Sequence, residues 1–177
     1  GLVADNVKLK SIVFGNPPFR KLGNINIEFA DRLTLIAGHN GIGKSTILGL
    51  VANTFGITNR GSPKSYFGEP FYANIERIVY LALAEVAEAQ KDLASSPIVT
   101  ASCNGVEVKK RCSMTHRSVW KRARVVPRTI DKSIDDTVGQ DAKIPLPTIY
   151  LGMRRLASAG EADEKEVASN KLDMHPS

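Results

Sequence analysis

Long hydrophobic runs, cysteine and tryptophan are scarce in this chain of 177 residues. The longest apolar stretch, residues 78–84, is far shorter than the roughly 18 residues that cross a membrane, so no membrane segment is expected. Cys103 and Cys112 are separated by eight residues, a spacing that fits neither a zinc knuckle nor a C-x-x-C redox pair. We expect free thiols in a reducing compartment, with a cross-strand disulfide as the alternative. The sequence has no internal repeat. Because no basic region followed by an apolar stretch is found, no signal peptide is expected and a cytoplasmic location is predicted.

The composition is that of a globular domain. Hydrophobic residues make up 42%, charged residues 24%, and the net charge is +6. These values exclude a disordered acidic tail, a collagen-like repeat and a disulfide-rich miniprotein. The length suits one domain with a core of its own and is short for two.

Apolar patterning predicts an α/β fold. Strands are expected at residues 9–14, 25–29, 33–37, 98–102, 106–110, 119–126 and 148–151. Helices are expected over residues 46–55 and 75–93. The pair Asn104–Gly105 tolerates positive φ and therefore predicts a tight hairpin turn. The second half of the chain thus reads as an antiparallel β-subdomain.

Residues 38–45, GHNGIGKS, match the phosphate-loop motif GxxxxGK[ST] in full. An apolar segment precedes the motif and a helix pattern follows it, which is the context that this loop requires. Backbone N–H groups must converge on phosphate, so glycines are needed where the loop turns tightly. Lys44 is expected to contact the β- and γ-phosphates, and the Ser45 hydroxyl to ligate Mg²⁺. The predicted cofactors are ATP and Mg²⁺, and the predicted binding residues are Asn40, Gly41, Ile42, Gly43, Lys44, Ser45 and Thr46.

The loop motif does not choose the reaction. Residues 136–139 match the GTPase switch pattern DxxG, and residues 170–173 match the guanine-recognition pattern NKxD. Both patterns should follow buried strands, and neither does here, so a GTPase is not favoured. No catalytic base is identified, and the catalytic residues remain unknown.

Beyond the loop itself, residues 19–22, 25–29 and 33–48 resemble the N-terminus of ABC-class ATPases. The closest branch is the SMC/RecF/OLD-like group of chromosome, repair and phage-defence ATPases, whose NGxGKST form is similar to residues 40–46. The resemblance covers about residues 9–56. More weakly, residues 120–128 and 149–156 resemble segments of AAA-type ATPases from bacterial defence loci.

Several motifs of that family have no counterpart here. A Walker B strand ending in Asp-Glu and an LSGGQ-like signature are missing from the sequence, and Gln140 is poorly placed to contact Mg²⁺. Residues 79–85 lie too close to Lys44 for Walker B and have helical spacing. The resemblance therefore implies a single, incomplete P-loop domain equivalent to a first lobe. Its predicted segments are a core at 1–56, a loop and helix at 57–97, the antiparallel β-subdomain at 98–156 and a polar tail at 157–177.

The resemblance also implies partners. ATP in this family is sandwiched between two heads, so a second lobe or protomer is expected, with slow or no hydrolysis by this chain alone. One of Arg20 and Lys21 would lie against the nucleotide, with a solvated turn as the alternative. Of the two, Arg20 joins the predicted binding residues, ranked below those of the phosphate loop. Arg154 and Arg155 are surface residues or phosphate contacts.

Residues 107–128 hold eight basic side chains and one acidic side chain. A basic hairpin with an interleaved aromatic residue is compatible with contact with DNA, while a solvated sheet face is the simpler interpretation. Two further functions stay open: a complete small P-loop kinase, and a DNA-binding module whose loop is vestigial.

Overall fold

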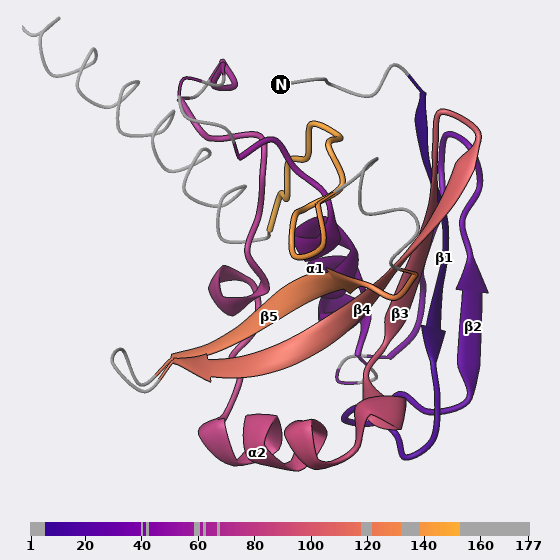
Figure 1. The fold of residues 1–177 in the computed structure, drawn as a ribbon, viewed down its shortest axis with the longest axis vertical. Coiled ribbons are helices and arrows are strands. Elements are labelled where there is room, and N and C mark those ends of the chain that lie inside the picture. Colours follow the sequence, from indigo (N-terminus) through magenta and orange to yellow (C-terminus); the bar gives the residue numbers. More distant parts are fainter. Residues whose placement is uncertain are drawn as a thin grey trace, which may run out of the picture.

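The computed structural model describes residues 6–39, 41, 43–58, 61, 63–66, 68–117, 122–131 and 139–152. Five strands form one antiparallel sheet in the order β2-β1-β3-β4-β5. The strands are β1 (Val7–Phe14), β2 (Ile25–Glu28), β3 (Ile98–Cys103), β4 (Val106–Arg117) and β5 (Arg122–Thr129). Figure 1 shows β4 and β5 as a long hairpin that extends away from the rest of the sheet.

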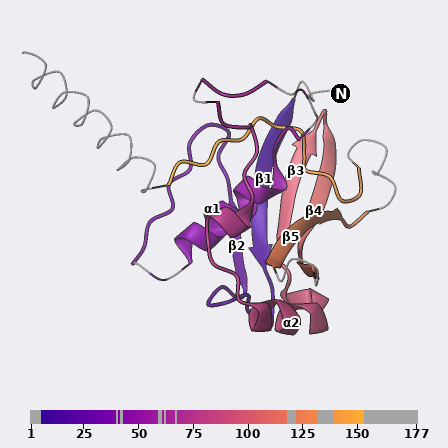
Figure 2. The ribbon, with the colours of Figure 1, turned by 90° about the vertical axis from the view of Figure 1, so that its left-hand side faces the viewer.

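The helices are α1 (Lys44–Thr54) and α2 (Leu83–Lys91), with short 3₁₀ turns η1 (Ile75–Arg77) and η2 (Leu93–Ser95). Helix α1 crosses one face of the sheet and α2 lies at its lower end (Figure 2). Side chains from α1 and from the inner strands form the core between them. Its most deeply buried members include Ile12, Phe14, Leu50, Ile75, Val99 and Val108.

A fully buried amide joins three elements of this layer. The Asn53 side chain on α1 donates to the carbonyl oxygen of Val125 on β5 at 3.0 Å. Its oxygen accepts the backbone N–H of Ile75 in η1 at 3.1 Å. Because a buried amide must find such partners, Asn53 fixes where η1 and β5 lie relative to α1.

The sheet confirms most of the strand predictions. The hairpin turn at Asn104–Gly105 has positive φ at both residues, 50° and 81°, as that residue pair predicts. The two cysteines are free and buried, and burial raises the pKa of Cys112 to about 12. In the register, Cys103 lies opposite Val106 and Cys112 opposite Pro127, so the alternative of a cross-strand disulfide is wrong.

Three predicted elements differ. Residues 33–37 precede the phosphate loop in extended form but belong to no strand, because no described segment pairs with them. Residues 148–151 are likewise outside the sheet. The helix predicted over 75–93 is broken into η1, a connection at 78–82 and α2, since the bond from Ile75 to Asn53 holds the first turn beneath α1. The polar tail lies outside the described residues.

Candidate nucleotide-binding site

The phosphate loop leads into α1 at Gly43. Gly43 has φ 104°, and a Cβ placed there would lie 2.9 Å from Cδ1 of Leu22. Gly41 also has positive φ, at 85°, with open space around it. The loop therefore needs glycine at residue 43 for two reasons, the left-handed backbone and the close approach of the β1–β2 connection.

The N-terminus of α1 has the properties of an anion site. Gly43 occupies the N-cap position without a side-chain cap, and no acidic residue lies in the first turn. The first N–H groups of a helix have no partner within the helix, and the helix dipole adds partial positive charge at this end. Such an N-terminus binds phosphate readily. The local sequence thus supplies a binding surface made of backbone.

Lys44 lies at the loop with its ammonium group donating to the carbonyl oxygen of Gly38. Both residues belong to the same loop, so the side chain folds back across it. A cavity of about 310 Å³ adjoins this point. Its lining consists of Arg20, Lys21, Gly41, Gly43, Lys44, Ser45, Thr46 and Val79.

Six of the eight residues proposed from sequence to bind nucleotide therefore line one cavity: Arg20, Gly41, Gly43, Lys44, Ser45 and Thr46. Asn40 and Ile42 lie outside the described residues. The cavity carries three cationic side chains and no acidic one, which suits a polyphosphate. The uncapped N-terminus of α1, the glycine turn before it and the cationic lining of the cavity therefore suit the phosphate groups of ATP.

Arg20 has contacts that sequence reasoning missed. It sits in a two-residue turn closed by reciprocal backbone hydrogen bonds between Phe19 and Leu22. Its guanidinium forms an ion pair with Glu85 of α2 and donates to Oγ1 of Thr46 at 3.2 Å. Glu85 lies 65 residues further along the chain. No local pattern connects the two residues, so only the fold could reveal the pair.

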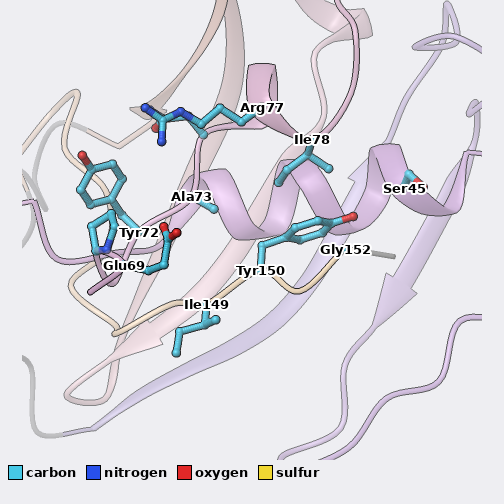
Figure 3. Close-up of a pocket in the computed structure, with 11 residues that line it drawn as sticks. Ser45, Glu69, Tyr72, Ala73, Arg77, Ile78, Ile149, Tyr150 and Gly152 are labelled. Atoms are coloured by element: carbon cyan, nitrogen blue, oxygen red, sulfur yellow. The ribbon is translucent and has the colours of Figure 1, made fainter. Parts of the chain in front are cut away.

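A second cavity, of about 400 Å³, lies along α1 (Figure 3). Ser45 lines this cavity as well as the first. Figure 3 shows the Tyr150 ring alongside the helix, Arg77 on η1 and Glu69 next to Tyr72. Ser45, the predicted Mg²⁺ ligand, is thus reached from two cavities.

Acidic metal ligands do not gather anywhere in the part of the chain that the structure describes, where no three His, Cys, Asp or Glu side chains could share an ion. Ser45 stays the one predicted Mg²⁺ ligand. Residues 79–82 are irregular and residues 83–85 begin α2, so this segment does not form a strand. Gln140 accepts bonds through its backbone from Lys110 and Thr129, at the end of the sheet rather than at the loop.

The basic hairpin is only partly a surface feature. Lys110 is fully buried, and its ammonium donates to Thr129, Gly139 and Gln140. The sequence reading that counted it in a solvated basic face is wrong for this residue, because three oxygen acceptors replace water around its charge. Residues with described, exposed side chains are Lys109, His116, Arg122 and Arg128. Trp120 and Lys121 lie outside the described residues, as do residues 136, 154, 155 and 170–173.

Sequence, loop and helix define a P-loop nucleotide-binding protein. A family model described as AAA domain matches residues 18–144, and the chain belongs to this family of P-loop ATPases. The family binds nucleotide, usually with Mg²⁺. Neither the curated proteins nor the solved structures yield a match. Among the described residues, no helix has the length and apolar character of a transmembrane span.

Proposed function

We propose that this chain is the first lobe of an ABC-class, SMC/RecF/OLD-like ATPase that binds MgATP and works with a second lobe or protomer. The observation that carries the proposal is the uncapped N-terminus of α1 beside a cationic cavity. Lys44 and the backbone N–H groups of residues 41–46 would hold the phosphates, and Arg20 would add a further cation. Mg²⁺ would bind at the Ser45 hydroxyl and neutralise phosphate charge.

ATP binding is tested with the pure chain, using labelled MgATP and following bound ATP and released ADP together. We expect intact ATP to be bound by the wild type and lost in Lys44→Ala. Lys91→Ala is the matched control, because Lys91 is exposed and its ion-pair partner in the described part of the chain is Glu88, three residues away. Absence of binding in both the wild type and Lys44→Ala would contradict the proposal, and steady Lys44-dependent turnover would contradict the need for a second lobe. ADP release that depends on an added phosphoacceptor would favour a kinase instead.

A partner beside the phosphate loop is supported by residues 33–37. Leu33 is 72% exposed and Leu35 85% exposed, while Thr34 and Ile36 are half-buried. This alternation is that of a strand with one free face, and its backbone pairs with no described segment. A strand from a second lobe or protomer would satisfy those backbone groups and bury the leucines.

Association is tested by sedimentation velocity of the chain with MgATP and with MgADP. If the partner is a second copy, the sedimentation coefficient rises with MgATP and the rise is lost in Leu35→Asp. Leu93→Asp serves as control, since Leu93 is exposed to 56% but lies on η2, away from the loop. A monomer under every condition would leave a separate lobe as the proposed partner.

We further propose that DNA contacts the β4–β5 hairpin, as in an ATPase of DNA repair or phage defence. In the ladder Arg111 lies opposite Arg128, and such like-charge pairs destabilise a sheet unless an anion is near. Arg128 approaches Asp141 at 3.6 Å, so part of that charge is already balanced. Lys109 is also exposed and approaches Glu107 at 3.7 Å, so its charge is partly balanced in the same way. Arg122 is a further exposed cation of the hairpin, and the proposal rests on these side chains together.

DNA contact is tested by anisotropy titrations of a labelled duplex over a range of salt concentrations. Removing two phosphate contacts with Lys109→Gln and Arg122→Gln should reduce the slope of log affinity against log salt by roughly 1.8. A double variant at Lys8 and Lys91, whose charges lie elsewhere, should keep the wild-type slope. Equal slopes for both double variants would contradict the proposal. Salt-sensitive DNA binding that ignores ATP would favour the module with a vestigial loop.

A further inference from the structure

The turn that carries Arg20 is connected to α2 by a two-point ion pair. Nε of Arg20 lies 2.6 Å from Oε1 of Glu85, and Nη2 lies 3.2 Å from Oε2. The two side chains are 28% and 26% exposed, so the pair is partly shielded from solvent. A two-point arginine–carboxylate pair fixes the plane and direction of the guanidinium as well as its position.

The arrangement divides the guanidinium into a held side and a free side. Glu85 and the Tyr80 carbonyl take the N–H groups of Nε and Nη2. Nη1 faces the phosphate-loop helix and donates to Thr46. An arginine has five N–H donors, so one N–H on Nη1 has no partner among the described residues. That donor belongs to a residue that lines the phosphate-loop cavity.

The backbone of Arg20 supports a specific role. Its φ is 55°, in the left-handed region that residues other than glycine rarely adopt. Such conformations persist where surrounding contacts hold them, and they are enriched at functional sites. The reciprocal bonds between Phe19 and Leu22 close the turn, and Glu85 holds the side chain that projects from it.

We propose that Glu85 is a positioning residue for triphosphate recognition: by holding Nε and Nη2, it directs Nη1 of Arg20 toward the terminal phosphate of a nucleotide in the phosphate loop. The proposal rests on the proposed function, because it needs nucleotide at that loop. Glu85 does not touch the nucleotide. Its effect is therefore on the preference for ATP over ADP, which differ by the phosphate that Arg20 would meet.

The test is a double-mutant cycle measured by calorimetric titration with MgATP and MgADP. The variants are Arg20→Gln, Glu85→Gln and the double substitution. Glu88→Gln is the matched control, since Glu88 is on the same helix and its partner among the described residues is the exposed Lys91. Thermal unfolding without nucleotide checks each fold. The ratio of the two dissociation constants is the readout, because a misfolded fraction lowers binding of both nucleotides alike.

We expect Arg20→Gln to reduce the ATP preference roughly tenfold or more, as loss of a charge-assisted hydrogen bond does. Glu85→Gln should reduce it by roughly threefold to tenfold with little change for ADP, and the double variant should match Arg20→Gln. The proposal is overturned if Glu85→Gln behaves as Glu88→Gln, if its effect adds to that of Arg20→Gln, or if it tightens ATP binding. Failure of the wild type to bind either nucleotide would instead remove the proposed function, and this proposal with it.

Discussion

The antiparallel sheet and the segment before the phosphate loop have similar apolar sequences but opposite surroundings. β3 is paired on both sides, by β1 and by β4, and its Val99 and Ala101 are fully buried. Residues 33–37 have no ladder partner among the described residues, and Leu35 is exposed to 85%. The comparison teaches that similar apolar sequences are buried where a strand has neighbours on both sides, as in β3, and remain exposed where no described segment pairs with them, as at residues 33–37.

The largest difference in stability between the two regions is expected when an apolar side chain is removed from each. Phe14 on β1 is 1% exposed, so Phe14→Ala should lower the free energy of unfolding by about 3–5 kcal/mol. Leu35→Ala should change it by about 0.5 kcal/mol or less, because the leucine has little burial to lose. Urea unfolding of both variants measures the difference. Equal losses would mean that residues 33–37 are packed in the isolated chain.

Gly43 stands where the two regions meet, and its substitution is expected to have the next largest effect. Gly43→Ala should cost about 2 kcal/mol, since it combines a left-handed backbone with the contact to Leu22. Gly41→Ala has the backbone penalty alone and should cost about 1 kcal/mol. Paired thermal and urea unfolding would separate the two contributions, and a smaller loss at Gly43 would show that Leu22 yields.

Lys143, which bonds to the end of α1, makes the stability of the folded core depend on pH. Its ammonium donates to the carbonyl oxygens of Asn53 and Ala73, and burial lowers its pKa from 10.5 to about 8. Between these values the unfolded chain binds more protons than the folded chain, so stability rises with pH across the window from about 8 to 10.5. Urea unfolding at pH 7.5 and 9.5 should show a gain of roughly 1–2 kcal/mol relative to Lys143→Met. No difference between the two proteins would mean that the amine is solvated.

The smallest effect on stability is expected at a surface ion pair between β1 and the chain just before residues 33–37. Lys8 and Asp31 approach at 3.7 Å and are exposed to 47% and 72%. Asp31→Asn should change stability by about 0.5 kcal/mol or less, and less still at high salt. A larger loss in a denaturant titration would show that this junction anchors the segment more firmly than its exposure indicates.

The sequence predicted those elements whose conformation is determined by a few neighbouring residues. The alternation of β1, the Asn104–Gly105 turn and the glycines that open α1 each carry their own conformational reason, and the structure has all three. The strand at 33–37 was wrong because strand formation needs a neighbour, which apolar sequence cannot supply. The helix at 75–93 was wrong because the amide of Asn53 holds Ile75 in a separate turn.

In the candidate site, too, contacts within the loop could be predicted from sequence, whereas contacts between distant segments could not. Gly41, Gly43, Lys44 and Ser45 of the loop motif line one cavity, because residues so close in sequence meet through local backbone geometry alone. The contact between Arg20 and Glu85 depends on the whole path of the chain from the first hairpin to α2. Lys110 was assigned to the surface because a basic run looks solvated in sequence, while its burial depends on the carbonyl groups of residues 139 and 140.

The same Lys110 ammonium has a consequence for protein engineering. It draws together Thr129, at the end of β5, and the carbonyl groups of Gly139 and Gln140, and the N–H of Thr129 bonds to Gln140 as well. Both ends of the stretch between residues 130 and 139 are thereby clamped at one point of the fold. A designer who replaced Lys110 as if it were an ordinary surface cation would therefore release the end of β5 and the backbone at residues 139 and 140 in a single step.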